Sequence, residues 1–312
     1  MINELVSVII PTYNRYDVLF RAINSVINQD HKNIEIIVVD DNYNNLELRN
    51  KIKQKIANDF PSIKLIALEK HLGGALARNV GVENASGEFL AFLDDDDEYV
   101  INKISKQLDL FFKSKDDRLA LVYCYGDIIY PGGLVEKEET DFAGWPIDVQ
   151  MTYNIAGTSF WMIKKSILKE IGGFYPIASH QDGVVLLNLL SKGYKVDLIR
   201  ESLVNYYAHG STSGITGVTE KNIKADDEYF SLCKNYFYMI TKKQQKKVEF
   251  NYYLNRMIDL LRIDKEKDAN DTKSEYNKKS KNIFRLLKIN FIWLFRKSYI
   301  KKIIAKDNKY EG

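Results

Sequence analysis

Short apolar runs alternate with longer amphipathic segments along the first half of the chain. Each run is rich in β-branched or aromatic residues and has almost no polar interruption, as in strands buried on both faces of a parallel sheet. The runs are Val6–Ile10, Ile34–Val39, Ile63–Leu68 and Phe89–Leu93. Between them, apolar residues recur at helical spacing. This alternation of strands and helices predicts a doubly wound α/β sheet.

The pattern loosens after about residue 115 and becomes wholly helical after Thr219. Leu119–Tyr125, Tyr194–Ile199 and Leu203–Tyr207 predict further strands, and Val184–Leu190 predicts a helix. We therefore expect an α/β domain over 1–217 and a helical, basic C-terminal region over 218–312. No run of about 18 apolar residues exists, so the sequence predicts no membrane span.

Size and composition fit a folded protein of one large or two smaller domains. The chain has 312 residues, of which 45% are hydrophobic. Its two cysteines, Cys124 and Cys233, stand far apart and have no CxxC partner, which favours a reducing cytoplasm over a disulfide framework. The N-terminus carries an acidic residue, Glu4, where a targeting segment has basic ones, so we interpret it as the first strand.

The net charge of +3 conceals an asymmetry. The segment from Asn277 to Lys306 contains ten Lys or Arg and no Asp or Glu. Since this segment carries +10, the rest of the chain sums to −7. The sequence thus describes a mildly acidic body with a basic tail.

Polar residues follow the predicted strands where those strands end. In open α/β sheets, ligands bind at the carboxyl ends of the strands. Four adjacent aspartates, Asp94 to Asp97, follow the strand at Phe89–Leu93. Their mutual repulsion would be relieved by a divalent cation, for which carboxylate oxygens are suitable ligands. The alternative is an acidic helix N-terminus, which would need only one or two of them.

Four segments of the chain form a specific pattern when taken together. They are Val6-Ser-Val-Ile-Ile-Pro-Thr-Tyr-Asn14, Ile36-Ile-Val-Val-Asp-Asp41, Gly73-Gly-Ala-Leu-Ala-Arg-Asn-Val-Gly81 and Gly87-Glu-Phe-Leu-Ala-Phe-Leu-Asp-Asp-Asp-Asp97. In this order and spacing they closely resemble the family 2 glycosyltransferases. The resemblance continues through Gly172-Gly-Phe174 to about residue 214. It implies a GT-A fold, a Rossmann-like α/β domain with a doubly wound mixed sheet, here followed by a helical extension.

The resemblance implies a division of roles among the four aspartates. Asp94-x-Asp96 matches the family's metal-binding Asp-x-Asp motif, with Asp96 the expected ligand of Mn²⁺ or Mg²⁺. Asp94 and Asp95 are expected nearer the ribose and the metal-bound water, and Asp97 is expected to cap the next helix. His209 matches a position where some relatives place a histidine near the metal or diphosphate, and a surface histidine is the alternative.

The resemblance also implies a nucleotide site. Asp41, with Asp40 beside it, matches the acid that accepts a hydrogen bond from the uracil edge, whereas a turn aspartate is the alternative. Pro11 and Tyr13 match the loop that lies against the nucleotide, where an aromatic ring can stack on the base. Arg15 follows in the same loop and belongs either to this site or to the surface.

Gly73-Gly74 is not a dinucleotide-binding loop, because such a loop would follow the first strand, where this chain has Pro-Thr-Tyr-Asn. In the same segment, Arg78 resembles the arginine of the family's Ala-Arg-Asn motif. It could neutralise phosphate, and a helix-surface arginine is the alternative.

Inverting transfer needs a base to take the proton of the acceptor hydroxyl. Asp182, in His180-Gln-Asp-Gly183, matches the family's base position, with a helix N-cap as the alternative. The family often has Glu-Asp here, whereas this chain has Gln181-Asp182. Trp145 and Trp161 are core residues or could stack on a sugar, Trp145 being the better candidate for the acceptor site.

The basic tail has an amphipathic pattern. Apolar residues, among them Phe284, Leu287 and Phe291, recur at helical spacing between Lys and Arg. Such a helix suits the surface of an anionic membrane, and the alternative is a helix that packs on its own domain or on another subunit. Nucleic acid is disfavoured because no recognition motif accompanies the charge.

The sequence therefore predicts an inverting glycosyltransferase that moves a sugar from a nucleotide diphosphate, with a UDP-hexose expected, to a hydroxyl of a glycan, either free, lipid-linked or protein-linked. We expect it in the cytoplasm, as a soluble protein or at the inner face of the membrane. A processive polymerase would need membrane spans and a Gln-x-x-Arg-Trp motif. The alternatives are a nucleotidyltransferase, which would need a basic Gly-rich first loop, and a non-catalytic sugar-nucleotide-binding protein.

Overall fold

The structure, a computed structural model, describes residues 2–208 and 218–309, with side chains as far as Ile304. All four predicted apolar runs of the first half form strands, which pair in parallel. These are β1 (Val6–Thr12), β2 (Ile34–Asp40), β3 (Lys64–Ala67) and β4 (Phe89–Phe92). The helices that connect them are α1 (Asp17–Ile27), α2 (Leu46–Asp59) and α3 (Gly74–Asn84).

The second half of the α/β part adds strands of both directions. The strands are β5 (Glu98–Tyr99), β6 (Leu119–Ile129), β7 (Val135–Glu138), β8 (Met162–Lys164) and β9 (Lys195–Tyr207). Between them lie α4 (Lys103–Lys113), α5 (Ile147–Gln150), the 3₁₀ turn η1 (Thr158–Phe160), α6 (Lys165–Glu170) and α7 (Gln181–Ser191). The two late strands that the sequence predicts are one strand, β9, whose pairing with β6 shifts register where the chain bends.

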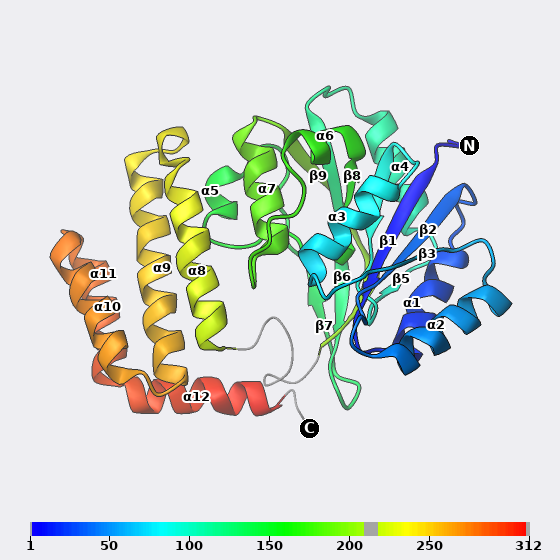
Figure 1. The fold of residues 1–312 in the computed structure, drawn as a ribbon. Coiled ribbons are helices and arrows are strands. Elements are labelled where there is room, and N and C mark those ends of the chain that lie inside the picture. The colour runs from blue at the N-terminus through cyan, green and yellow to red at the C-terminus, as the bar shows by residue number, and fades with distance from the viewer. Residues whose placement is uncertain (1, 209–217, 310–312) are drawn as a thin grey trace.

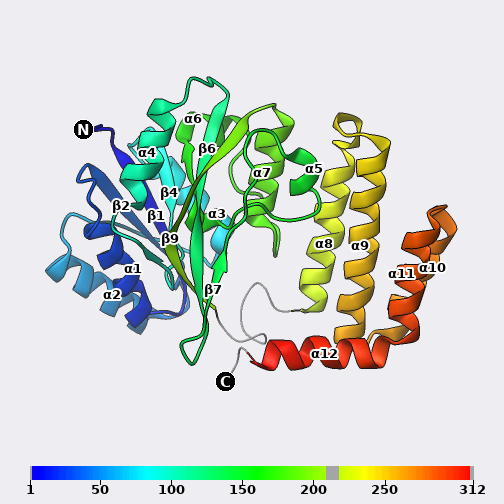
Figure 2. The ribbon, with the colours of Figure 1, turned by 180° about the vertical axis from the view of Figure 1, so that it is seen from behind.

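The described residues form a nine-stranded mixed sheet in the order β3-β2-β1-β4-β8-β6-β9-β5, with β7 paired to β6. Helix α3 covers one face and α1 and α4 cover the other (Figures 1 and 2). Gln29, after α1, bonds the main chain of Val100 and Ile104, which ties α1 to the start of α4. This mixed sheet with helices on both faces confirms the predicted fold class.

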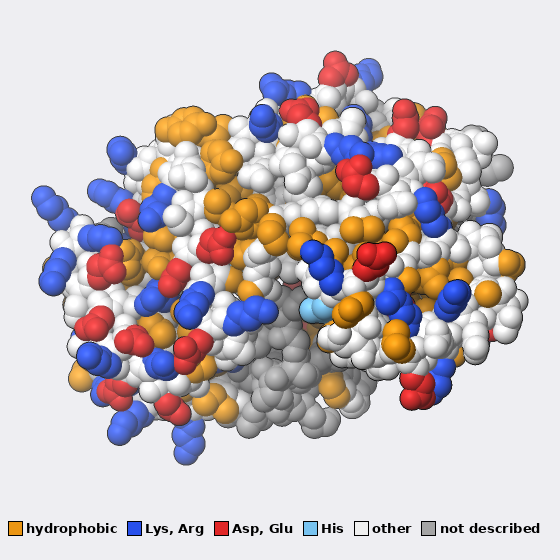
Figure 3. All heavy atoms as spheres, viewed as in Figure 1, with side chains coloured by type: hydrophobic (Ala, Val, Ile, Leu, Met, Phe, Trp, Pro, Cys, Tyr) orange, Lys and Arg blue, Asp and Glu red, His pale blue; other side chains and the backbone are white. Residues whose placement is uncertain are grey.

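The C-terminal part is helical, as predicted. It contains α8 (Glu220–Lys234), η2 (Phe237–Met239), α9 (Lys242–Arg262), α10 (Glu266–Lys279), α11 (Ile283–Leu294) and α12 (Arg296–Lys309). These helices stand beside α7, at the end of the molecule away from β3, and α12 crosses below α8 and α9 (Figures 1 and 2). On the face in Figure 3, basic and acidic side chains are mixed over this helical part. In the described part of the chain, no helix is both long and apolar enough to cross a bilayer.

Two hydrophobic cores hold the molecule together. The larger one fills the space around the sheet and extends into the helical part through Tyr229, Phe230, Cys233 and Val248. The smaller one joins α9, α10 and α11. The expected boundary after residue 217 is therefore not a boundary of the larger core, because α8 and the start of α9 pack on the α/β part.

Two segments that carry the family resemblance meet between α3 and the end of α6. Gly173 has a φ of +71°, and a Cβ there would lie 2.6 Å from Oδ1 of Asn79. With glycine at this position, Asn79 accepts a hydrogen bond from the Phe174 amide and donates one to the Phe174 carbonyl, both at 2.8 Å. The segment Gly172-Gly-Phe174 is thus bonded to α3, the helix that carries Arg78. From this segment the chain continues to Asp182 at the start of α7.

Candidate active site

The candidate active site lies at the carboxyl ends of β1, β2 and β4. These strands are parallel neighbours, and Thr12 at the end of β1 pairs with Asp40 at the end of β2. The loop of four aspartates follows β4. Because parallel strands bring their carboxyl ends to one edge, this edge collects the polar residues that the sequence analysis singled out.

Asp95 and Asp96 are buried, and both form salt bridges with the guanidinium of Arg15. Nη1 of Arg15 lies 2.6 Å from Oδ1 of Asp95 and 2.7 Å from Oδ2 of Asp96. Thr12 donates a hydrogen bond of 2.7 Å to the other oxygen of Asp95. Arg15 therefore contacts the aspartate loop, and its part in nucleotide binding stays a prediction.

The titration of this cluster reflects both burial and charge. Burial raises the pKa of the Asp95 carboxyl, although Arg15 and the Thr12 hydroxyl oppose the rise. Partial burial lowers the pKa of Arg15, but Asp95 and Asp96 more than compensate, so it lies above its usual value. The guanidinium thus stays charged between the two carboxylates.

The residues present fit a hard divalent cation in one respect. Oxygens of Asp95 and Asp96 face a common point, where this structure has a guanidinium nitrogen, and carboxylate oxygens are the ligands that Mn²⁺ and Mg²⁺ prefer. In the described part of the chain, no group of three or more His, Cys, Asp or Glu could hold a metal. The remaining ligands would have to come from a bound diphosphate or from His209, which lies outside the described residues.

Asp94 belongs to a second cluster, with Arg78 at its centre. The buried guanidinium of Arg78 donates through Nη2 to Asp94 and through Nη1, at 3.1 Å, to Oε1 of Gln181. This contact gives Gln181 a role that the sequence analysis could not assign. It connects the aspartate loop with the start of α7, where Asp182 lies.

The expectation that Asp97 caps a helix is wrong. The chain after Asp97 forms β5, which pairs with β9, and α4 begins only at Lys103. Asp97 is fully buried and accepts hydrogen bonds from the Ser159 hydroxyl at 2.7 Å and the Tyr207 amide at 3.2 Å. Burial raises its pKa well above the ordinary value, and the negative charge of Asp94 and Asp96 raises it further.

Asp41, just after β2, and Tyr13, just after β1, both contact His71. Asp41 is buried and accepts hydrogen bonds of 2.8 Å from the amides of Leu72 and Gly73, one on each oxygen. His71, which the sequence analysis missed, lies 3.0 Å from the same carboxylate, and its ring centroid is 4.4 Å from that of Tyr13. Both the Gly73 amide and the His71 ring contact Oδ2 of Asp41, whereas Oδ1 has only the Leu72 amide and can accept a further hydrogen bond.

Asp40 and Pro11 have structural positions at the same edge. Asp40 is buried and accepts hydrogen bonds from the main chain and the side chain of Asn42. The side-chain oxygen of Asn42 in turn accepts a bond of 2.6 Å from the amide of Asn14. Pro11 lies in β1, paired with Val39. These contacts fix the loop that carries Tyr13 and Arg15.

Asp182 lies in the first turn of α7. Its carboxylate accepts hydrogen bonds of 2.8 Å from the Asn154 side chain and from the amide of Gly183. The cap residue of the helix is His180, so the N-cap alternative for Asp182 is not what the structure shows. Burial raises the pKa of the Asp182 carboxyl, although its hydrogen bonds and the charges of His180 and Arg78 oppose the rise.

Tyr206, near the end of β9, is a residue that the sequence analysis missed. Burial raises the pKa of its hydroxyl, and the charges of Asp97, Asp94, Asp96 and Asp182 raise it further. Both the aspartate loop and Asp182 therefore lie close enough to Tyr206 to act on it. No local motif indicated this position, because only the pairing of β9 with β6 brings it there.

Neither tryptophan joins this cluster. Trp161 is fully buried, which confirms the core alternative. Trp145 is 38% exposed, but its indole donates to the carbonyl of Leu190, near the end of α7. Asp182 lies eight residues earlier in the same helix, about 12 Å away along its axis. The structure thus does not bring Trp145 to the candidate base.

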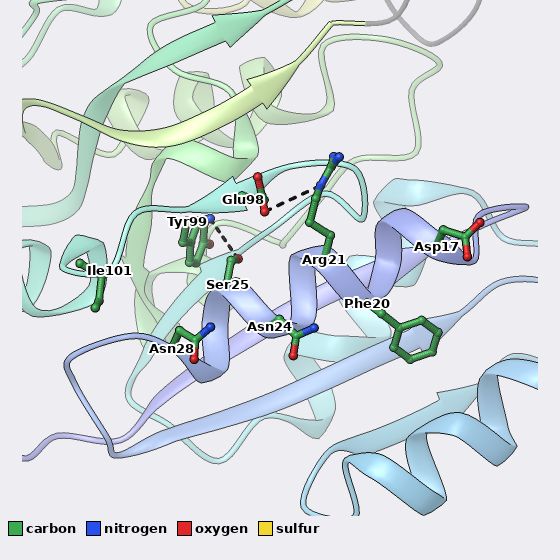
Figure 4. Close-up of a pocket in the computed structure, with 9 residues that line it drawn as sticks. All are labelled: Asp17, Phe20, Arg21, Asn24, Ser25, Asn28, Glu98, Tyr99 and Ile101. Atoms are coloured by element: carbon green, nitrogen blue, oxygen red, sulfur yellow. Dashed lines mark hydrogen bonds and ion pairs between the residues drawn. The ribbon is translucent and has the colours of Figure 1, made fainter.

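A groove of about 600 Å³ lies on the other side of the aspartate loop, between α1 and β5 (Figure 4). Arg21 reaches from α1 toward Glu98, and its guanidinium lies 3.7 Å from the ring centroid of Tyr207. Arg21 also donates to the carbonyl of Asp96. The groove therefore borders the site through Arg21, which holds the aspartate loop against the end of β9.

The fold and the site together define a class of protein, a GT-A glycosyltransferase. Comparison with known proteins then gives the family. The model of "Glycosyl transferase family 2" matches residues 7–172, and the chain belongs to this family. It is a glycosyltransferase, which excludes the two alternative functions that the sequence analysis left open.

Curated relatives and solved structures agree with this assignment. The chain is 30% identical, over 62% of its length and 72% of the relative's, to the Escherichia coli UDP-Glc:alpha-D-GlcNAc-diphosphoundecaprenol beta-1,3-glucosyltransferase WfaP. The structure of S. aureus TarS in complex with UDP-GlcNAc matches 81% of each chain with a TM-score of 0.58 and 17% identity. The mannosyltransferase PcManGT from Pyrobaculum calidifontis, solved with GDP-Man and Mn²⁺, matches 97% of this chain and 84% of its own with a TM-score of 0.60 and 15% identity. The two structures support the fold alone.

Proposed function

We propose that this enzyme transfers a hexose from a UDP-sugar to a hydroxyl of a growing glycan, with inversion at the anomeric carbon. The observation that carries the proposal is the position of Asp182. Its half-buried carboxylate follows Gln181, and Arg78 bonds both Gln181 and Asp94, so the start of α7 is tied to the aspartate loop. An acceptor between them would have a base on one side and the donor on the other.

In the proposed step, Asp182 takes the proton of the acceptor hydroxyl as that oxygen attacks the anomeric carbon. The new bond joins the acceptor oxygen to this carbon, and the bond from the carbon to the diphosphate oxygen breaks. UDP leaves with the bonding electron pair. Asn154 holds the Asp182 carboxylate in place through its hydrogen bond of 2.8 Å.

The donor side of the site is assigned to the residues at the ends of β1, β2 and β4. We propose that Asp41 accepts a hydrogen bond from the base and that Tyr13 stacks on it, with Pro11 behind the loop. Arg15 and Arg78 would neutralise the diphosphate, and Asp94 and Asp95 would lie nearest the ribose. Asp96, with His209 as a second candidate ligand, would hold Mn²⁺ or Mg²⁺, which stabilises the negative charge of the leaving diphosphate.

One named relative supports a lipid-linked glycan as the acceptor. WfaP is named for a UDP-glucose donor and an acceptor linked to undecaprenol through a diphosphate. We propose a lipid-linked acceptor of this kind and a location in the reducing cytoplasm, either free or at the membrane. Both Cys124 and Cys233 are buried free thiols, which is consistent with a reducing compartment.

A panel of nucleotide sugars tests the donor. The protein is heated with each compound in the presence and absence of Mn²⁺, and the true donor is expected to raise the melting temperature because it binds only the native state. The UDP-hexoses are expected to stabilise more than GDP-mannose, and Mn²⁺ is expected to increase the effect. Stabilisation by GDP-mannose alone would contradict the assignment of UDP.

A substitution at Asp182 tests the base. Asp182→Asn keeps the size of the side chain and is expected to abolish transfer while UDP still binds with Mn²⁺. The matched control is Asp141→Asn, at an exposed aspartate that pairs with Arg200 far from the strand ends, and it should leave transfer intact. Retained transfer by Asp182→Asn would refute the assigned base.

A further inference from the structure

Helix α11 is apolar on two opposite faces. Its inward side chains, Ile289 and Ile292 with Leu286 and Trp293, pack in the smaller core with α9 and α10. Its outward side chains, Phe284, Leu287, Phe291 and Leu294, point to solvent. An apolar face of a helix is normally buried. The outward side of α11 is therefore an apolar face that is left exposed to solvent.

The outward residues form one continuous stripe, which we call the outer face of α11. Phe284, Leu287, Phe291 and Leu294 follow one another at intervals of three or four residues, which places them on one side of the helix. Phe284 is 79% exposed, Leu294 70% and Phe291 64%. Phe295, just past the helix, contacts Phe291, with ring centroids 4.7 Å apart and the planes tilted by 50°. Exposed apolar stripes of this kind mark interaction sites.

The segment that carries the outer face has charges of one sign. Between residues 277 and 306 the chain has ten Lys or Arg and no Asp or Glu. Lys279 and Arg296 pair with Glu275 and Glu266 of α10. The exposed lysines at 281, 297, 301 and 302 have no acidic partner among the described residues. Along the chain, exposed lysines thus precede and follow the stripe, and two of them, Lys297 and Lys301, line a groove with Asp264 and Glu266.

We propose that the outer face of α11 binds to the surface of an anionic membrane. Phe284, Leu287, Phe291 and Leu294 would enter the boundary between headgroups and acyl chains, and the lysines around them would contact lipid phosphates. A second copy of the chain is the less favourable occupant, because a symmetric contact would bring two segments of +10 together. The apolar stripe matches the acyl chains of such a membrane, and the positive charge matches its anionic headgroups.

The place of the tail relative to the site gives this contact a purpose. Helix α12, which follows α11, lies on the side of the molecule toward which β1 and β9 run (Figures 1 and 2). That is the side of the candidate active site. If the proposed lipid-linked acceptor is correct, the membrane contact would hold the enzyme where such acceptors lie. The contact itself can be measured without donor or acceptor, so it can fail or succeed independently of the proposed function.

Co-sedimentation with vesicles tests the proposal. The full-length protein is mixed with vesicles of phosphatidylcholine and phosphatidylglycerol, or of phosphatidylcholine alone. It is expected to bind the anionic vesicles, and the binding is expected to weaken at high salt because ions screen the lysines. The double variant Phe284→Gln/Phe291→Gln is expected to bind them at least about tenfold more weakly, because two large side chains no longer leave water.

Two control variants separate the contributions. Tyr238→Gln changes an apolar ring that is equally exposed, at 79%, but lies outside the tail, and it should bind as the unmodified protein does. Lys297→Gln/Lys301→Gln/Lys302→Gln should lose the preference for anionic vesicles. Equal binding to both vesicles, or unchanged binding of the double variant, would overturn the proposal. So would a dimer of the unmodified protein that Phe284→Gln/Phe291→Gln converts to a monomer, since a second copy would then cover the face.

Discussion

The imidazole of His180 stacks on the ring of Tyr229, with ring centroids 4.6 Å apart and an angle of 9° between the planes. His180 also lies 2.6 Å from the carboxylate of Asp226. Tyr229 and Asp226 belong to α8, whereas His180 is the cap residue of α7 and has a left-handed backbone with φ of +61°. The C-terminal helical part therefore holds the turn from which the candidate base projects.

Removal of the Tyr229 hydroxyl is expected to destabilise the protein. This hydroxyl accepts a hydrogen bond of 3.0 Å from the side chain of Gln150 and donates one of 2.8 Å to its carbonyl, both buried. Tyr229→Phe keeps the stacking on His180 and should lower the free energy of unfolding by about 1–2 kcal/mol. Urea denaturation measures this. Tyr238→Phe, at an exposed hydroxyl, is the control and should change nothing.

Replacement of Arg78 by lysine is expected to lower transfer strongly. One ammonium cannot reproduce the two-sided contact with Asp94 and Gln181, and a charge-assisted hydrogen bond contributes about 1.5–3 kcal/mol. Arg78→Lys should therefore reduce kcat/KM by roughly ten- to a hundredfold. Arg118→Lys changes an arginine whose bond goes to the carbonyl of Lys192 on the surface and should have no effect. An unchanged kcat/KM for Arg78→Lys would show that the guanidinium fork is dispensable.

Removal of the charge of Arg15 is expected to strengthen metal binding. The guanidinium and a divalent cation would compete for the same oxygens of Asp95 and Asp96 and would repel each other. In the absence of nucleotide, Arg15→Gln should bind Mn²⁺ at least about tenfold more tightly, measured from the electron paramagnetic resonance of the free ion. Arg200→Gln, which unpairs the surface residue Asp141, serves as the comparison. Weaker Mn²⁺ binding by Arg15→Gln would show that the metal is held elsewhere.

The rate of transfer is expected to fall on acidification at a higher pH than for an exposed aspartate. Asp182 accepts a proton only when ionised, and burial raises its pKa above the ordinary value. The acid limb of kcat/KM against pH should therefore lie above about pH 3.9, the ordinary value. A limb at or below that pH would show that Asp182 is not the group that titrates.

The same shift predicts a change in stability with a definite sign. Because the folded pKa of Asp182 is raised, the fold tolerates its protonated form better. Its contribution to stability is full below the unfolded pKa and is lost as pH rises through the folded pKa. Asp182→Asn imitates the protonated form, so it should be more stable than the unmodified protein at neutral pH. This difference should shrink as the pH falls, which urea denaturation at several pH values measures.

The sequence predicted what depends on local pattern and missed what depends on long-range pairing. The apolar runs and the aspartates that follow β4 lie where their spacing indicated. The sequence predicts a helix near Tyr99 with Asp97 as its cap, whereas that segment forms β5 by pairing with residues more than a hundred positions later. Tyr206 and His71 carry no motif, and only the folded sheet places them beside the carboxylates. Gln181 and Arg78 are 103 positions apart in the sequence, so neither local sequence predicts their contact.

The continuity of the larger core across residue 217 determines where this chain can be recombined with its relatives. Tyr229, Phe230 and Val248 pack in the same core as the sheet. An exchange after residue 217 would therefore combine the turn at His180 from one enzyme with the helix that contacts this turn from another. Helices α10 to α12 instead pack in the smaller core with α9. A graft that begins within α9 after Arg256 would keep the bonds of Tyr252 and Arg256 to Asp227 of α8 and would replace the basic tail. Chimeras built at that junction could change where the enzyme works without changing its chemistry.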